Sequence, residues 1–304
     1  LPSIAIFFLA YALLGKYLPY SLGGHRGYSF ARVFSYITGM DGMLSTPLAT
    51  SASFVFLFFL FSAFLASTGA GQFFIDIAMA VAGGKRGGPA KGAVIGSALF
   101  GTISGNSAAN VVASGTFTIP MMIKVGYSPR FASAVEAVAS TGGQMTPPIL
   151  GAAAFIIAEY VNVPYIEVAK AAAIPAFAAY AGLLWITHVE ACKLGLRGLS
   201  KSELPSFWTT LKEGLHFLIP ICMLLYELIM QHSAEMSVFR AIVVLALIML
   251  GQPVVKAFVH KKSKRKALKE GIKTLLLSLS AGGSNMAGVA MATASAGIIV
   301  GCVS

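Results

Sequence analysis

The segment Gly92–Tyr160 decides the fold, and it reads GAVIGSALFGTISGNSAANVVASGTFTIPMMIKVGYSPRFASAVEAVASTGGQMTPPILGAAAFIIAEY. Two of its apolar runs flank a polar, small-residue stretch, Ser104–Asn110 (the first break), and a third run is interrupted by Ser140–Pro148 (the second break). Peptide groups that leave a helix inside lipid must be buried in protein or line a water-filled cavity. Paired broken segments are typical of binding sites near the membrane midplane. The segment therefore indicates an ion- and substrate-binding site.

Composition places the whole chain in a membrane. It has 304 residues, of which 57% are hydrophobic and 11% charged, and its mean hydropathy is +0.79. A soluble domain carries about 25% charged residues. Several uncharged runs are long enough for helices to cross a hydrocarbon core of about 30 Å. We therefore predict an all-α, polytopic membrane protein with a re-entrant helical hairpin and a discontinuous helix, similar to an ion transporter.

The net charge of +11 does not indicate a nucleic-acid partner. Lys and Arg gather in short loops between apolar runs, which the positive-inside rule explains. The three cysteines form no CxxC pair, so neither a disulfide framework nor a zinc site is supported. The chain begins at Leu1 and ends at Ser304, each within an apolar run, and we expect it to be a truncated half of a longer polypeptide.

The distribution of Lys and Arg predicts the topology. We expect a linking helix and interfacial loop over 1–47, a first inverted repeat over 48–190, connecting helices and basic cytoplasmic loops over 191–270, and the truncated start of a second repeat over 271–304. Within the first repeat we expect a scaffold helix over 48–67, an in-plane helix over 72–82, a re-entrant hairpin over 92–124, a broken helix over 131–160 and a helix over 165–188. Basic residues flank both ends of the hairpin, so both ends are placed on the cytoplasmic side.

Two of these elements keep an alternative interpretation. The helix over 72–82 has Phe73, Phe74, Ile77 and Val81 on one side, which fits an in-plane helix or a short buried helix equally well. The region 92–124 could instead be two tilted helices with a polar packing seam. We favour the hairpin because each apolar arm, at ~1.5 Å per residue, is too short to span.

The two breaks offer the oxygen ligands that a hard cation such as sodium requires. Carbonyl ends of half-helices add partial negative charge, and N-terminal ends favour anions. Neither break contains a carboxylate, which suits a site for an anionic substrate beside cations. The candidate sodium- and substrate-binding residues are Ser104, Gly105, Asn106, Ser107, Asn110, Thr141, Gly142, Gly143, Thr146 and Pro147, with Gln144 as a further polar group. The alternative is that the Ser and Asn residues only cap helices.

Glu136 lies inside an apolar run, where a carboxylate is a functional candidate by default. It is six residues from Arg130, so a structural ion pair or a snorkelling role is favoured equally. The five histidines do not pair at metal-ligand spacing, and we assign them no chemistry; they are His25, His188, His216, His232 and His260.

The stretches GTISGNSAANVVASGTFTIPMM and GYSPRFASAVEAVASTGGQMTPPILGAAAFIIAEY resemble the large membrane subunit of TRAP (tripartite ATP-independent periplasmic) transporters, most closely the fused permeases of the TAXI type. RGGPAK before the hairpin and VEACKLGLRGLSKSELP after helix 165–188 extend the resemblance to nearly the whole chain. In that family the two breaks form sodium and substrate sites. Asn106 departs from the family pattern, where Ser is expected more often, which leaves the ion coordination open.

The resemblance implies a multi-pass protein of the prokaryotic inner (cytoplasmic) membrane that imports organic acids, dicarboxylate or glutamate-like, by an elevator mechanism. It implies sodium ions as coupling ions and no other cofactor. The implied partners are a periplasmic substrate-binding protein and a small membrane subunit or fused equivalent helices. The family's second hairpin and second broken helix would lie beyond Ser304. No enzymatic activity is implied.

Two other functions remain to be weighed. A sodium/anion carrier of related fold that needs no binding protein has the same local features. An intramembrane serine hydrolase would need a histidine within hydrogen-bond reach of Ser104. His188 is the one plausible partner, and the sequence places it at the cytoplasmic end of its helix.

Overall fold

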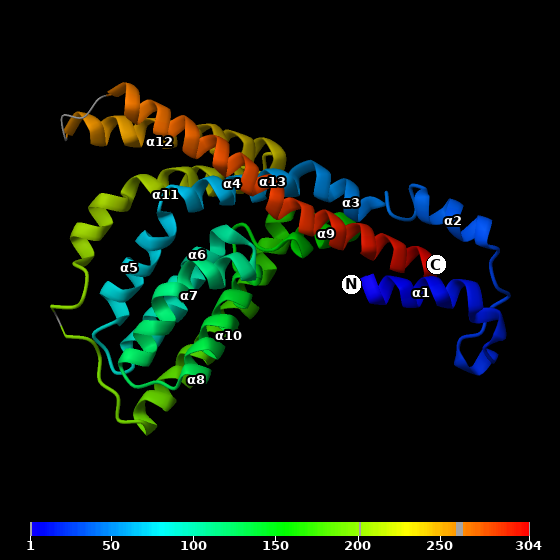
Figure 1. Ribbon diagram of the computed structural model, residues 1–304, viewed down its shortest axis with the longest axis horizontal. Helices are drawn as coiled ribbons and strands as arrows, with labels where there is room; N and C mark the ends of the chain where they lie inside the picture. Colours follow the sequence, from blue (N-terminus) through cyan, green and yellow to red (C-terminus); the bar gives the residue numbers. More distant parts are fainter. Residues whose placement is uncertain (1, 201, 260–263, 304) are drawn as a thin grey trace.

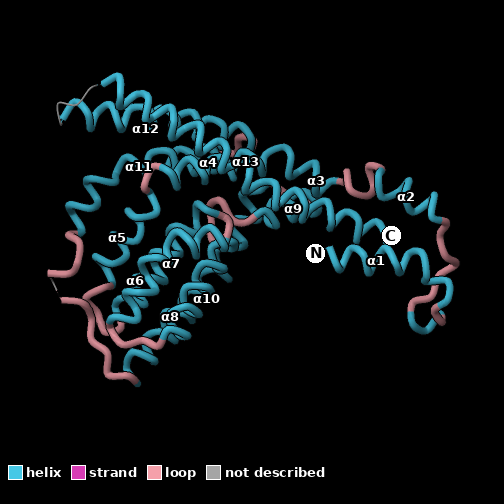
Figure 2. Tube along the Cα trace, in the orientation of Figure 1, coloured by secondary structure: helices cyan, strands magenta, loops and turns pink. Residues whose placement is uncertain are grey.

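The computed structural model describes residues 2–200, 202–259 and 264–303, and within these ranges the secondary structure is entirely helical (Figures 1 and 2). The first helices are α1 (Pro2–Leu14), α2 (Phe30–Thr38), α3 (Thr46–Thr50), α4 (Phe56–Ser67) and α5 (Ala70–Ala82). The central ones are α6 (Gly88–Ser104), α7 (Ser107–Lys124), α8 (Pro129–Gly142), α9 (Ala152–Val161) and α10 (Tyr165–Lys193). The last are α11 (Phe207–Ile229), α12 (Ala234–Val259) and α13 (Lys264–Val303). Short helical turns are η1 (Gly15–Tyr17), η2 (Tyr20–Leu22), η3 (Ser51–Val55) and η4 (Gly143–Met145).

Figure 1 shows α6, α7, α8 and α10 as a bundle at one end of the molecule, with α5 and α11 beside it and α12 and α13 along its upper edge. We call these four helices the hairpin bundle. They share an apolar core with members on all four helices, including Val94, Met122, Val135 and Leu183. An arm made of α1, α2, α3 and the C-terminal part of α13 extends away from the bundle.

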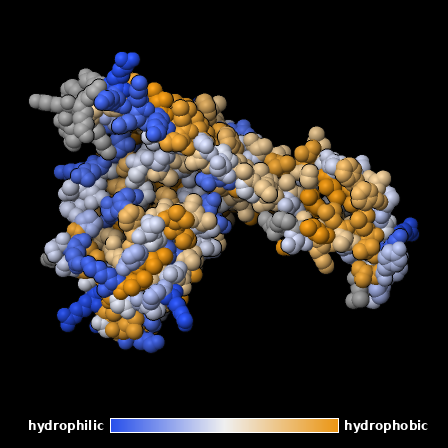
Figure 3. Space-filling model, in the orientation of Figure 1, coloured by the Kyte–Doolittle hydropathy of each residue, from blue (hydrophilic) through white to orange (hydrophobic). Residues whose placement is uncertain are grey.

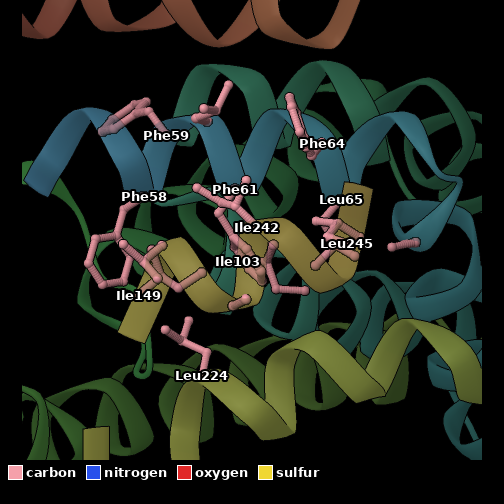
Figure 4. Packing of buried hydrophobic residues seen from close by; sticks show 14 of the residues in the cluster. Phe58, Phe59, Phe61, Phe64, Leu65, Ile103, Ile149, Leu224, Ile242 and Leu245 are labelled. Carbon is pink, nitrogen blue, oxygen red and sulfur yellow. The ribbon is translucent and has the colours of Figure 1, made fainter. Parts of the chain in front are cut away.

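A second core surrounds α4 and connects the bundle to the long helices. Phe58, Phe61 and Leu65 of α4 are almost completely buried. Figure 4 shows them close to Ile103 and Ile149 and to residues of α11 and α12, which include Leu224, Ile242 and Leu245. Because Ile103 precedes the first break and Ile149 follows the second, this core holds both breaks against α4.

The hairpin forms because its two arms carry strong end signals. Gly105, in the left-handed region at φ +56°, ends α6, and the Asn106 side chain begins α7 by accepting a hydrogen bond from Ala109 N at 3.2 Å. A backbone position with positive φ is most easily occupied by glycine, and Asn is a preferred residue at a helix N-cap. At ~1.5 Å per residue the 17- and 18-residue arms are about 26 Å long, longer than the sequence predicted. The antiparallel pair is observed, and its re-entrant placement stays a prediction.

The predicted broken helix is confirmed. Ser128 caps α8 by accepting from Phe131 N at 3.2 Å, and α8 ends at Gly142. The chain then makes the η4 turn and does not resume an α-helix until Ala152. Two consecutive prolines, Pro147 and Pro148, lack the N–H groups that a continuous helix would need.

Among the described residues, three helices are long and apolar enough to cross a membrane by length and composition, and α3 with α4 forms a bent fourth candidate at 46–67. The three are Tyr165–Lys193, Ala234–Val254 and Arg265–Cys302. The bent candidate agrees with the expected scaffold helix over 48–67, and Tyr165–Lys193 agrees with the expected helix over 165–188. The outer face in Figure 3 is largely apolar along the helices, with hydrophilic residues at their ends. The number of long apolar helices is therefore that of a multi-pass membrane protein.

On the predicted apolar face of 72–82, Val81 is 52% exposed. Phe73 and Phe74 are buried, and the Phe73 ring lies 5.7 Å from that of Phe217 on α11. α5 packs against both α6 and α11, so the buried part of its surface is set by these two neighbours. Val81 lies outside that part. A short packed helix is the better description of the two alternatives.

The region of the expected second repeat is one continuous helix in the structure. α13 contains 40 residues and packs against α1, α4 and α12. Ser51 Oγ donates to Thr293 Oγ1 at 3.1 Å, and Ser67 shares a hydrogen bond with Ser278, so two polar contacts join α13 to the α3–α4 segment. The proposed domain boundaries stay predictions. Residues 1, 201, 260–263 and 304, among them His260, lie outside the described residues.

Candidate functional site

The two breaks lie directly against each other. A Cβ built on Gly101 would lie 2.5 Å from the Gly143 Cα, and one on Gly143 would lie 2.7 Å from the Gly101 Cα. Ile149 N donates to Thr102 O at 3.3 Å, so backbone after the second break pairs with backbone before the first. This contact was expected from the sequence, because neither break can face lipid alone.

Side chains close the junction at the hairpin tip. Gln144 Nε2 donates to Ser107 Oγ at 3.0 Å, and Gly151 N donates to Gln144 O at 2.7 Å. A Cβ on Gly105 would meet Leu150 O at 2.4 Å, so the tip touches the second break without room for a side chain. Ser107 and Gly105, both predicted site residues, therefore belong to the contact.

Ser104 lies at the centre of this junction, and its hydroxyl group forms no hydrogen bond with the described residues. Its side chain is 5% exposed, and its Oγ has no hydrogen-bond partner among the described residues. Its carbonyl accepts from Ser62 Oγ of α4 at 3.3 Å. A buried hydroxyl without a partner costs about 1–3 kcal/mol, so this unused group distinguishes Ser104 from the hydroxyls of the junction that have partners.

Asn110 holds the two hairpin arms together. It is completely buried; its Nδ2 donates to Ser97 O at 3.0 Å, and its Oδ1 accepts from Ser97 Oγ and Ser114 Oγ, each at 3.3 Å. The amide thus lies within the junction, but its oxygen already has two donors. Ser97 gave no signal in the sequence, because a single serine in GSALF does not distinguish a buried contact from an exposed one.

The remaining predicted residues divide into two groups. Gly142 and Gly143 are buried at the junction, whereas Thr141 is exposed and donates to Ala137 O of its own helix at 2.8 Å. Thr146 Oγ1 donates to Gly142 O at 2.8 Å and to Tyr180 Oη at 3.4 Å, and half-buried Pro147 follows it. The structure therefore does not bring Thr141 into the junction.

Two tyrosines support the second break, and the sequence reasoning missed both. Tyr165 Oη donates to Pro148 O at 2.8 Å and to Ile149 O. Tyr180 Oη donates to Ala139 O at 2.9 Å. They satisfy carbonyls that the interrupted helix leaves unpaired. Nothing local distinguishes them from other tyrosines, because their role depends on how α10 packs.

Glu136 is neither ion-paired nor snorkelling, so both of its favoured structural interpretations are wrong. Its side chain is 0% exposed, Arg130 is exposed, and no ion pair to Glu136 is present among the described residues. Four hydroxyls surround the carboxyl group instead. They belong to Ser97 of α6, Ser114 and Thr118 of α7, and Ser140 of α8. This polar cluster lies within the hairpin bundle, and Ser97 and Ser114 also contact Asn110.

The arrangement does not support a serine hydrolase. His188 Nδ1 lies 2.9 Å from Lys91 Nζ, at the opposite end of α6 from Ser104. Thirteen residues of helix, about 20 Å, separate Lys91 from Ser104. The described residues contain no group of three metal-ligating side chains.

Comparison with known proteins agrees with these features. The family described as "Tripartite ATP-independent periplasmic transporter, DctM component" matches residues 3–304. A C4-dicarboxylate TRAP transporter large permease protein of Vibrio cholerae is 38% identical over 106 residues, which are 35% of this chain and 23% of that protein. The corresponding protein of Rhodobacter capsulatus is 28% identical over 169 residues, 52% of this chain and 38% of that protein.

An ectoine/5-hydroxyectoine TRAP transporter large permease protein of Ruegeria pomeroyi is 38% identical over 77 residues, 25% of this chain and 18% of that protein. The matched segments thus cover well under half the length of these curated relatives. The family match, by contrast, covers nearly the whole chain. The chain therefore belongs to the DctM family of large permease components of tripartite ATP-independent periplasmic transporters, which are transporter subunits and not enzymes.

Proposed function

We propose that this chain carries one half of the transport site of a sodium-coupled, binding-protein-dependent importer of organic acids. The observation that supports this most is the partnerless, buried Ser104 Oγ at the place where the two breaks meet. The hydroxyl would be a sodium ligand. It is buried, and neither break contains a carboxylate that would compete with an anionic substrate.

The directions of the four half-helices support a paired cation and anion site. α6 ends at Ser104 and α8 ends at Gly142, so two carbonyl ends with partial negative charge meet at the junction. α7 begins at Ser107 and α9 at Ala152, so two N–H ends with partial positive charge begin there. Sodium would bind at the carbonyl ends, with the carboxylate of the substrate at the N–H ends.

The names of the relatives support the substrate class, and the resemblance to the family implies the partners. The Vibrio cholerae and Rhodobacter capsulatus proteins are named as C4-dicarboxylate permeases, and an isethionate permease of Oleidesulfovibrio alaskensis is named DctMQ. All three names refer to organic anions. We propose an organic acid substrate, a periplasmic substrate-binding protein, and a small membrane subunit or fused equivalent helices as partners in a prokaryotic inner membrane. The TAXI type remains our assignment from the resemblance.

An elevator movement would carry the hairpin bundle past α4, α12 and α13. The contact that would have to break includes the hydrogen bond from Ser62 Oγ on α4 to the Ser104 carbonyl. This carbonyl is also at the C-terminal end of α6, where the cation would bind. Sodium binding and release of the bundle from α4 would therefore involve the same oxygen atom.

The test is uptake of a labelled C4-dicarboxylate by proteoliposomes that contain the assembled transporter with this chain. We expect uptake to require both a sodium gradient and the binding protein. Uptake that is unchanged when choline replaces sodium would contradict sodium coupling. Sodium-dependent uptake without the binding protein would instead identify a binding-protein-independent carrier.

A further inference from the structure

The carboxyl group of Glu136 is enclosed by hydroxyls in the hairpin bundle. Thr118 Oγ1 donates to Oε2 at 2.6 Å, and Oε1 accepts from Ser97 Oγ at 3.3 Å, from Ser140 Oγ at 3.2 Å and from Ser114 Oγ. All five side chains are at most 1% exposed. We call the four hydroxyls the Glu136 cage. It joins three helices, α6, α7 and α8.

Among the residues that the structure describes, no positively charged side chain forms an ion pair with the carboxylate. The basic groups on the neighbouring helices α6 and α7 are engaged elsewhere: Lys91 with His188 at 2.9 Å and Lys124 with Glu203 at 3.1 Å. The η4 turn, Gly143–Met145, has no ionisable side chain.

On α10, Tyr180 is in electrostatic contact with Glu136, and its hydroxyl donates to a backbone carbonyl. The other ionisable groups of α10 lie toward its two ends; they are Tyr165, Glu167, Lys170, His188, Glu190, Cys192 and Lys193. On α8 itself, Arg130 is exposed in the first turn.

Burying an unpaired ionised carboxylate is costly, and adding a proton removes that charge. The Glu136 cage can accommodate both forms because its hydroxyls have alternative acceptors. Ser114 Oγ also lies 2.7 Å from Asn110 O, and Thr118 Oγ1 lies 3.1 Å from Ser114 O. With an ionised carboxylate the hydroxyls donate to it. With a protonated one they rotate to the backbone carbonyls, and the acid donates its own proton to a serine oxygen.

The oxygens of the Glu136 cage are spaced for direct hydrogen bonding. Ser97 Oγ and Ser140 Oγ are 3.0 Å apart, and each is within 3.3 Å of the carboxyl group. Protonation of the carboxyl group fits this spacing, because it only replaces one hydrogen-bond donor by another.

The Glu136 cage is connected to the junction of the two breaks. Ser97 and Ser114 can each donate either to Glu136 or to Asn110 Oδ1, 3.3 Å away. The Asn110 Nδ2 atom is in turn 3.4 Å from a Cβ built on Gly101 and 3.3 Å from one built on Gly143. A change of protonation at Glu136 thus changes the donors available to an amide that contacts the junction.

We propose that Glu136 is a proton-binding site of the hairpin bundle, and that it takes up one proton from water and releases it again during the transport cycle. The carboxylate plus one proton gives the neutral acid, and no other reactant is needed. The assignment to the transport cycle rests on the proposed function, whereas proton binding by Glu136 does not.

Proton binding is tested by infrared difference spectroscopy of the assembled, detergent-solubilised transporter between acidic and alkaline pH. We expect a band of a protonated, hydrogen-bonded carboxyl group in the wild type and in the control Glu159→Gln, because Glu159 is exposed. The band should be absent from Glu136→Gln, whose amide imitates the neutral acid, and shifted in Thr118→Val. A wild-type spectrum without such a band, or a band that persists unchanged in Glu136→Gln, would overturn the proposal.

Coupling to transport is tested in proteoliposomes with a pH gradient imposed at constant sodium. We expect lowering the external pH by one unit to raise initial uptake about threefold or more in the wild type and in Glu159→Gln, and to leave Glu136→Gln unaffected. An equal pH response in Glu136→Gln would overturn the coupling. Replacing sodium by choline in the same vesicles tests the proposed function separately, so a failure of sodium dependence leaves the infrared result standing.

Discussion

Gly101 and Gly143 face each other so closely that neither has room for a methyl group. The built Cβ atoms lie 2.5 and 2.7 Å from the opposite Cα. Gly101 is near the end of the first hairpin arm, and Gly143 begins the turn that interrupts the broken helix. This contact brings the two breaks together, and the proposed site exists only while it holds.

Alanine at either position should therefore separate the breaks. We expect Gly101→Ala and Gly143→Ala each to destabilise the protein by about 1–3 kcal/mol through overpacking, and to abolish most uptake. The measurement is thermal unfolding together with uptake by the assembled transporter. Gly182→Ala on α10 is the control, because nothing lies within 4 Å of its built Cβ. Uptake and stability of Gly143→Ala equal to those of the control would show that the contact is unimportant.

Tyr165 should be required for the shape of the second break. Tyr165→Phe removes the donor to the Pro148 and Ile149 carbonyls and leaves them in an apolar setting. We expect a loss of about 1–3 kcal/mol in the free energy of unfolding, since buried acceptors lose their partner. Tyr160→Phe, at a residue 59% exposed, is the control and should change stability little. Equal stability of the two variants would argue against a supporting role.

Asn110 and Ser104 should respond differently to substitution. Asn110→Ala removes the amide donor to the buried Ser97 carbonyl and one acceptor of the Ser97 and Ser114 hydroxyls, and we expect it to destabilise the hairpin by about 1–3 kcal/mol. Ser104→Ala removes a hydroxyl that has no partner, so stability without sodium should be unchanged or higher. Thermal unfolding in choline buffer checks both. A strongly destabilised Ser104→Ala would indicate a structural hydroxyl.

Tyr127 lies in the turn between α7 and α8, and its hydroxyl should lose its proton at a higher pH than an ordinary tyrosine. Burial raises the pKa of Tyr127 from 10.0 to about 12, with smaller contributions from Glu190 and Cys192. Because the folded-state pKa is the higher one, its contribution to stability is complete below pH 10 and is lost as pH rises toward 12. Phenolate absorbance of the wild type minus Tyr127→Phe should show this late titration. A difference curve centred near pH 10 would contradict it.

Much of the site could be predicted because its signals are local. Glycine, proline and amide residues within apolar runs mark the point where a helix ends. Lipid offers no hydrogen bonds to the peptide groups of such an end, so two helix ends inside the membrane are expected to pack against each other. The predicted breaks at Ser104–Asn110 and Ser140–Pro148 are where α6 and α8 end. Thr141, by contrast, belongs to the same polar run but faces outward, because helical rotation and not composition decides its side.

The residues that the sequence did not reveal form contacts with parts of the chain that are far away in sequence, and a local sequence pattern carries no information on such contacts. Ser97, Tyr165 and Tyr180 reach their partners from separate helices, so their roles depend on packing. Glu136 could be identified as a candidate, but its hydroxyl partners could not, since three of the four come from other helices. The exposure of Val81 has the same origin, because the packing of α5 against α6 and α11 decides which of its residues are buried.

The most direct test of the account is equilibrium binding of sodium to the assembled transporter carrying Ser104→Ala. Ser133→Ala is the matched control, because Ser133 is an exposed serine on α8. We predict that Ser104→Ala weakens sodium binding about tenfold or more, which corresponds to ~1.4 kcal/mol, while Ser133→Ala binds sodium as the wild type does. Sodium affinity that is the same in all three proteins would contradict a cation site where the two breaks meet.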